Sequence, residues 1–155
     1  MIQDYILVAI FASFPESLLV LLIGFSLCNI RNVDPLKLLL VAAIQTVLSL
    51  LIRMSNIYFG IHTIILMVSL YILVVILFKV KYYKAVIPVL IGMLSQGLLQ
   101  SITLPVISAI FDIDLTYVYY STESLIFCSI PISALSLVLL MIIRKNRFSL
   151  FDIGC

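Results

Sequence analysis

One glutamate, one arginine, one histidine and two glutamines stand out in this sequence because they lie within or beside long apolar stretches. They are Glu16, Arg53, His62, Gln96 and Gln100. Glu16 follows Pro15 inside the stretch FASFPESLLVLLIGF, which covers residues 11–25. Where water is excluded, such side chains can pair charges, pass a proton or bind a polar ligand. We therefore take these five residues as the candidate ligand-binding residues.

The composition explains why polar residues in these stretches are unusual. The chain has 155 residues, of which 65% are hydrophobic and 10% are charged, whereas soluble domains have about 25% charged residues. A chain this apolar cannot hide its surface from water, so its solvent must be the lipid bilayer. Its length predicts one domain, covering residues 1–155. The net charge of +2 is too small to indicate nucleic-acid binding.

Five apolar runs are long enough to cross a membrane as helices, which need about 20 residues. They cover residues 5–28, 36–52, 60–78, 85–111 and 124–143. The runs are continuous rather than alternating, which indicates helices and not barrel strands. Asp34-Pro35 predicts the start of the second helix, with an N-cap residue followed by a first-turn proline. The predicted fold class is an all-α polytopic integral membrane helix bundle with five transmembrane helices.

The basic residues predict the orientation of these helices. Eight of the nine lysines and arginines fall on one side of the predicted membrane: Arg31, Lys37, Lys79, Lys81, Lys84, Arg144, Lys145 and Arg147. The other side receives only Arg53. Because cytoplasmic loops carry the excess of Lys and Arg, we expect the N-terminus outside and the C-terminus inside, across the cytoplasmic membrane.

With this topology, the polar candidates share the outer half of the bundle. Gln96 and Gln100 are spaced i, i+4 and therefore lie on one face of the fourth helix. Each residue also has a structural interpretation: the glutamines as interhelical contacts contributing about 0.6 kcal/mol each, Arg53 as an interfacial anchor, and His62 as a residue at the water boundary. The tyrosines of the outer loop, Tyr117, Tyr119 and Tyr120, fit an interfacial aromatic belt or the cap of a pocket.

Signals of catalysis are missing. The sequence has one histidine and lacks a phosphate-binding glycine loop, an HExxH motif and a nucleophile elbow. Gly60-Ile61-His62 resembles membrane peptidases that process cyclic autoinducer peptides, but those carry a cysteine about two helical turns after the histidine. Ser69 stands at that place here, so the thiolate nucleophile is missing. We expect no enzymatic activity, no cofactor, no metal and no disulfide between Cys28 and Cys128.

Several short segments together resemble a known family. They are Glu16-Ser17-Leu18-Leu19, Leu51-Ile52-Arg53, Phe59-Gly60-Ile61-His62-Thr63, and the long fourth span with Gln96, Gln100 and Pro105. Over about residues 5–150 they resemble the N-terminal multi-span membrane sensor region of clostridial and related bacterial GHKL-class histidine kinases. After Ile143 only RKNRFSLFDIGC follows, without a phosphoacceptor or nucleotide-binding motif. The resemblance implies a sensor without kinase activity. The partners to expect are a histidine kinase, another membrane protein or a second copy of the chain.

The leading hypothesis is therefore a non-catalytic sensor or regulatory module for signal transduction in a two-component system. A small membrane transporter or substrate-binding subunit is the alternative, because Gly92, Gly97 and Pro105 predict a broken fourth helix of the kind transporters use. A structural membrane partner, assembled through small-residue helix faces, is the third hypothesis. We also expect Pro131 in the first turns of the fifth helix, where proline is tolerated.

Overall fold

The computed structural model describes residues 6–30, 33–55, 59–111 and 122–151, and these are helical apart from turns and ends. The elements are the π-helix η1 (Ala9–Ser13), α2 (Phe14–Leu27), α3 (Pro35–Met54), α4 (Phe59–Phe78), α5 (Tyr82–Phe111) and α7 (Thr122–Lys145). Five helical segments are long and apolar enough to cross a membrane. The predicted all-helical architecture with five candidate transmembrane helices is confirmed.

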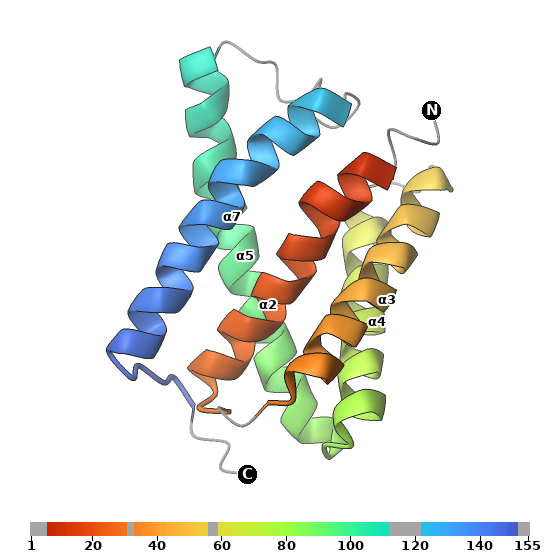
Figure 1. Cartoon of the computed structure of the whole chain (residues 1–155), viewed down its shortest axis with the longest axis vertical. Helices are drawn as coiled ribbons and strands as arrows, with labels where there is room; N and C mark the ends of the chain where they lie inside the picture. Colours follow the sequence, from red (N-terminus) through yellow and green to blue (C-terminus); the bar gives the residue numbers. More distant parts are fainter. Residues whose placement is uncertain (1–5, 31–32, 56–58, 112–121, 152–155) are drawn as a thin grey trace.

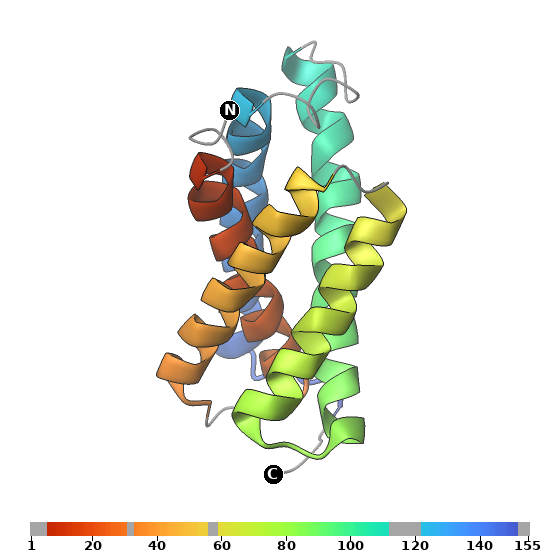
Figure 2. The same ribbon diagram turned by 90° about the vertical axis from the view of Figure 1, so that its right-hand side faces the viewer.

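The helices form two layers, with α7, α2 and α3 in one and α5 and α4 in the other (Figures 1 and 2). α2 is the central helix and packs against α3, α5 and α7. Because successive helices run in opposite directions, η1 and the end of α7 lie at opposite ends of the bundle (Figure 1). We call these the Arg53 end and the lysine end. The lysine end carries Lys37, Lys79, Lys81, Lys84 and Lys145.

Local sequence signals explain where the helices begin and end. The Asp34 carboxylate accepts a hydrogen bond from Leu36 N at 3.0 Å, and Pro35 starts α3, as predicted. At the lysine end, α2, α4 and α7 are each followed by a residue in the left-handed conformation: Asn29 (φ 57°), Lys79 (φ 52°) and Arg147 (φ 49°). That conformation ends a helix by turning the chain away from its axis. Three of the tight turns therefore lie at this end.

Two glycines let α2 and α5 approach at backbone distance. A Cβ built on Gly24 would overlap the carbonyl oxygen of Pro88, and one built on Gly92 would overlap that of Val20. The pairs Val20/Gly24 and Pro88/Gly92 are each spaced by four residues, so the two contacts lie one helical turn apart. Small residues at such spacing allow close helix packing in membranes. The Cα–H groups of the glycines point at carbonyl oxygens, which adds weak attraction.

The apolar core fills the half of the bundle nearer the lysine end. Its buried members come from four helices: Val20, Leu21 and Phe25 of α2, Leu38 and Val41 of α3, Leu70 and Val74 of α4, and Ala85 and Val89 of α5. The rings of Phe25 and Phe78 meet edge to face, with their centroids 5.4 Å apart. A smaller cluster joins Leu19, Ile23 and Leu27 to Leu140 and Ile143 of α7. The core therefore closes the lysine half of the interior with apolar side chains.

One expectation about the fourth span is corrected. α5 is one continuous helix through Pro88, Gly92, Gly97 and Pro105, so the predicted broken helix is not formed. Gly92 serves the contact with α2 instead. Pro131 lies in the early turns of α7, which begins at Thr122, in agreement with the sequence. A membrane helix tolerates interior prolines where neighbouring groups satisfy the freed carbonyls.

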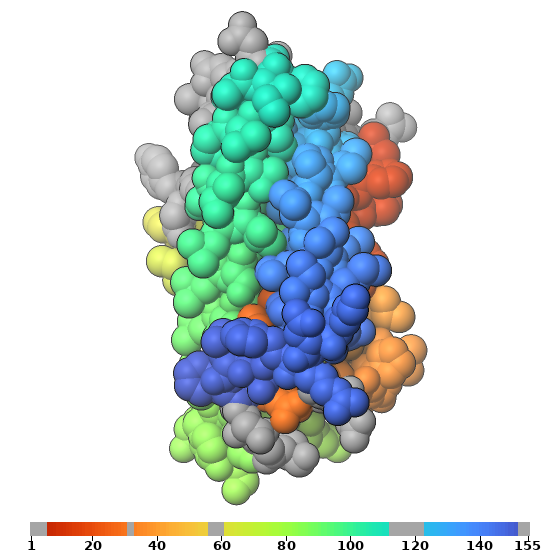
Figure 3. Space-filling model, turned by 90° about the vertical axis from the view of Figure 1, so that its left-hand side faces the viewer, coloured from red at the N-terminus to blue at the C-terminus, as the bar shows by residue number. Residues whose placement is uncertain are grey.

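After α7 the chain folds back onto the end of α2. Phe148 N donates to Ile143 O at 3.0 Å, which completes the turn at Arg147. Leu150 N then donates to Leu27 O at 2.8 Å, and Phe151 N donates to the same oxygen at 3.3 Å. Figure 3 shows this segment (dark blue) lying across the lower part of the α5–α7 face. The described C-terminal residues are thus attached to the last turn of α2.

Candidate functional site

Glu16 lies where a π-helix meets an α-helix. Pro15 has no N–H and its ring crowds the carbonyl four residues earlier, so the preceding turn cannot remain α-helical without strain. This turn is instead the π-helix η1, in which Phe14 N donates to Ala9 O, five residues earlier in the chain. Single π-helical turns are frequent at functional sites. Here the wider turn precedes Glu16, which lies half-buried in the first turn of α2.

Glu16 is bonded to α5. Gln100 Nε2 donates to Glu16 Oε1 at 2.5 Å, across the close α2–α5 contact. In lipid neither group has water as an alternative partner, so each depends on the other for its hydrogen bond. The sequence predicted that Glu16 would face helical neighbours, and the structure places it against Gln100.

Arg53 and His62 complete a polar group at the Arg53 end. Arg53, in the last turn of α3, lies near enough to Glu16 for their charges to attract. The Arg53 charge also acts on His62, near the start of α4. Both side chains are half-buried. Arg53 Nε and His62 Nε2 are buried and have no hydrogen-bond partner within the part of the chain that the structure describes. We refer to Glu16, Gln100, Arg53 and His62 as the Glu16 group.

Gln96 is bonded to a different helix. Its Oε1 accepts a hydrogen bond from Ser136 Oγ of α7 at 2.9 Å, while its Nε2 is buried and lacks a partner among the described residues. Gln96 is one turn from Gln100 on α5, but it joins α5 to α7 and not to Glu16. The structure therefore brings four of the five predicted residues together and places the fifth beside them. Binding of a ligand by any of the five stays a prediction.

Further polar side chains continue inward from the Glu16 group. Ser13 and Ser49 approach each other through their hydroxyl oxygens at 3.4 Å. Gln45 Nε2 donates to Leu66 O at 2.8 Å, and Ser69 Oγ donates to Gln45 Oε1 at 3.0 Å. These contacts lie between η1 and α3 and between α3 and α4. They line the half of the interior nearer the Arg53 end and stop at the apolar core.

Sequence reasoning did not single out Ser13, Ser49 or Ser136, although one signal was available. Gln45, Ser49 and Arg53 are spaced i, i+4, i+8 and so form a stripe along one face of α3. The buried side of α3 includes Gln45 and Ser49, which identifies that stripe as the interior face. Ser136 has no such signal because its partner, Gln96, is 40 residues away in sequence.

The side chains of the Glu16 group are of types that can bind a polar or charged ligand. The group offers a carboxylate, a guanidinium and an imidazole in a setting sheltered by helices, where electrostatic interactions are stronger than in water. Within residues 6–30, 33–55, 59–111 and 122–151, no three His, Cys, Asp or Glu residues gather as metal ligands. Cys28 and Cys128 are buried free thiols on other parts of the bundle. The expected tyrosines of the loop 112–121 lie outside the described residues.

Comparison with known proteins found no matching family model, no matching curated protein and no matching solved structure.

Proposed function

We propose that this chain is a non-catalytic sensor or regulatory module of the cytoplasmic membrane, with the N-terminus outside and the C-terminus inside. A signal binds at the Arg53 end, to the Glu16 group, with Gln96 one turn deeper. The observation that carries the proposal is the hydrogen bond from Gln100 to Glu16 beside the charge of Arg53. An ionisable residue held inside a membrane bundle is costly, so its presence favours a functional role.

The proposed orientation follows from the distribution of basic residues. Among the described residues, Arg53 is at one end and seven lysines and arginines are at the other: Lys37, Lys79, Lys81, Lys84, Arg144, Lys145 and Arg147. The positive-inside rule assigns the lysine end to the cytoplasm. Reporter fusions at the two termini should therefore report opposite compartments, and reporters in the same compartment would refute this orientation.

α2 gives the proposed signal a route to the cytoplasmic side. Its first turn holds Glu16, and the carbonyl of Leu27 in its last turn accepts hydrogen bonds from Leu150 and Phe151. A ligand that binds one arrangement of α2 better than another shifts the population toward that arrangement. The attached C-terminal residues then change their contacts inside the cell. A histidine kinase or another membrane protein is the proposed partner that reads this change.

The transporter alternative loses its main support, because α5 is continuous where a broken helix was expected. The polar side chains also stop at an apolar core that includes Val41, Leu70 and Val74, which are almost completely buried. A transport path would need polar side chains through this core, so its apolar packing supports the sensor proposal.

Hydrogen exchange of the Leu150 amide tests the proposal. Glu16→Gln keeps an oxygen for Gln100 but removes the carboxyl group that interacts with Arg53. We expect this change to shift the balance of bundle arrangements by about 1–2 kcal/mol, or 5–30-fold. We expect the Leu150 amide, which bonds to Leu27 O, to exchange faster by that factor.

Two controls make the result specific. Glu123→Gln removes an exposed carboxylate in the first turn of α7, at the same end of the bundle. Gln45→Leu removes a buried polar contact between α3 and α4 and lowers stability without touching α2. Neither should change exchange at Leu150 by more than about twofold. Equal effects of Glu16→Gln and either control would refute the coupling.

A further inference from the structure

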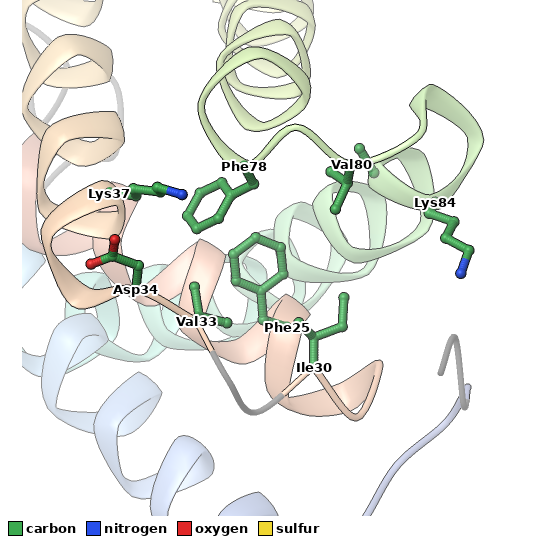
Figure 4. A pocket seen from close by; sticks show the side chains of 9 residues that line it. Phe25, Ile30, Val33, Asp34, Lys37, Phe78, Val80 and Lys84 are labelled. Carbon is green, nitrogen blue, oxygen red and sulfur yellow. The ribbon is translucent and has the colours of Figure 1, made fainter. Parts of the chain in front are cut away.

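A second site lies at the lysine end, remote from the Glu16 group. A cavity of about 200 Å³ opens where α2, α3, α4 and α5 meet. Its walls are apolar and its rim is charged (Figure 4). The lining residues are Phe25, Ile30, Val33, Asp34, Lys37, Phe78, Val80, Lys84 and Ala85.

The inner wall of the cavity is aromatic. Phe25 and Phe78 meet edge to face there, and Phe25 is only 5% exposed. Lys37 extends its ammonium toward the Phe78 ring from α3, while Lys84 stands on the opposite side of the cavity on α5 (Figure 4). A ligand that fits must therefore be amphipathic, with an apolar part for the phenyl rings and a polar part for the lysines.

The electrostatic setting favours an anion. α3 and α5 begin at this end while α2 and α4 end there, so the opposed helix dipoles largely offset one another and the positive charge comes from the lysine side chains. Lys79 and Lys81, both exposed, add positive charge in the turn before α5. Asp34 is the single acidic residue of the lining, and its carboxylate already accepts the hydrogen bond from Leu36 N that caps α3.

We infer that this cavity binds an anionic phospholipid, with the phosphate at Lys37, the glycerol region against Phe25 and Phe78, and Lys84 adding positive charge from the far side of the rim. Basic pockets between membrane helices on the cytoplasmic side are suited to anionic headgroups. Tyr82 and Tyr83 are exposed beside the rim, as is typical of residues at headgroup depth. Inorganic phosphate has no apolar part to pack against the apolar wall, so the ligand we infer is a lipid. It does not depend on the function proposed for the Glu16 group.

Thermal unfolding of the full chain in a neutral detergent tests the inference. Phosphatidylglycerol should raise the unfolding temperature, whereas phosphatidylcholine with the same acyl chains should not. Each lysine near an anionic surface affects binding about fivefold. Lys37→Gln and Lys84→Gln should therefore each raise the half-saturating lipid concentration about fivefold, and the double variant about 25-fold. Lys145→Gln, exposed at the same end on α7, is the matched control and should have no such effect.

A cavity-filling variant separates a built site from general attraction to a basic surface. Val33→Phe keeps both lysines but occupies part of the cavity, so it should weaken the phosphatidylglycerol effect while leaving unfolding in phosphatidylcholine unchanged. Glycerol phosphate and inorganic phosphate at matched concentration should not reproduce the stabilisation. The inference is overturned if a soluble phosphate or phosphatidylcholine raises the unfolding temperature as much as phosphatidylglycerol does. It is also overturned if Val33→Phe binds phosphatidylglycerol normally, or if Lys145→Gln weakens phosphatidylglycerol binding as much as Lys37→Gln does.

Discussion

The close contact between α2 and α5 predicts a large difference between two alanine substitutions on the same helix. Gly92→Ala would place a methyl group against Val20, whereas Gly97→Ala would place it in open space, with no atom of the described structure within 4 Å. Both substitutions add the same group to the interior of α5. The gain in helix propensity, about 0.8–1.0 kcal/mol, is therefore common to both, and the difference between the variants isolates the overlap with α2.

The size of that difference follows from the geometry. A Cβ at position 92 would lie 3.1 Å from the carbonyl carbon of Val20 and would overlap its oxygen. Two carbon atoms prefer roughly 3.5–4.0 Å, so α2 and α5 must separate by about 0.5–1 Å. The obstacle is backbone, which cannot rotate aside as a side chain can. Overpacking of this kind costs about 1–3 kcal/mol, and we expect Gly92→Ala to be less stable than Gly97→Ala by about that amount.

The assay is reversible unfolding of each variant in the same lipid–detergent mixture, with the free energy of unfolding compared at one composition. A second readout follows from the position of Gln100 two turns beyond Gly92. When the helices separate, the hydrogen bond to Glu16 weakens, so exchange of the Gln100 side-chain amide protons should rise in Gly92→Ala only. Equal stabilities for the two variants would show that α2 and α5 are not in backbone contact.

Three further predictions concern other parts of the bundle. Gln45→Leu removes a side chain that bonds both Leu66 O and Ser69 Oγ, and it should lower the free energy of unfolding by about 0.6–1.7 kcal/mol; no change would mean that α4 is held by apolar packing alone. Asp34→Ala removes the cap of α3 and should cost about 1 kcal/mol, whereas Asp34→Asn should cost much less. Burial raises the pKa of the Cys28 thiol to about 11, so the thiol form contributes stability that is complete below about pH 9 and lost as the pH rises toward 11. With Cys128 and Cys155 replaced by alanine, maleimide should label Cys28 slowly at pH 8 and faster near pH 11, and rapid labelling at pH 8 would contradict its burial.

Local signals in the sequence predicted the helices well because lipid imposes strong rules. Apolar runs of about 20 residues gave the five helices, since backbone groups in lipid must bond within their own segment. Asp34-Pro35 gave the start of α3 for the same local reason: a capping carboxylate and a proline act on the adjacent turn. The error concerned α5. Gly92 and Pro105 suggested a break in α5. Whether a proline or glycine bends a membrane helix, forms a contact with another helix or leaves the helix unbroken depends on the neighbouring helices.

The candidate site was predictable in part. Glu16 was identified by its type alone, since a carboxylate in an apolar run needs a partner. Gln100 was one of several candidates for that partner, because spacing on α5 placed it on a face with Gln96 but did not say which helix that face meets. In the structure, Gln100 is hydrogen-bonded to Glu16 and Gln96 is hydrogen-bonded to Ser136. Pairings over such sequence separations depend on how helices are rotated about their axes, which no local pattern specifies.

The sequence alone determined that this chain lies in a bilayer, that it forms five helices, and that its positive charge gathers at one end. Each of these follows from composition and from the length of apolar runs, which are properties of single segments and do not depend on how the helices pack. The tertiary structure decided which polar groups meet, how the lysine-rimmed cavity forms and where the C-terminal residues attach. Those outcomes depend on the close approach of α2 and α5 at Gly24 and Gly92, because the depth and rotation of that contact fix the position of every side chain beside it.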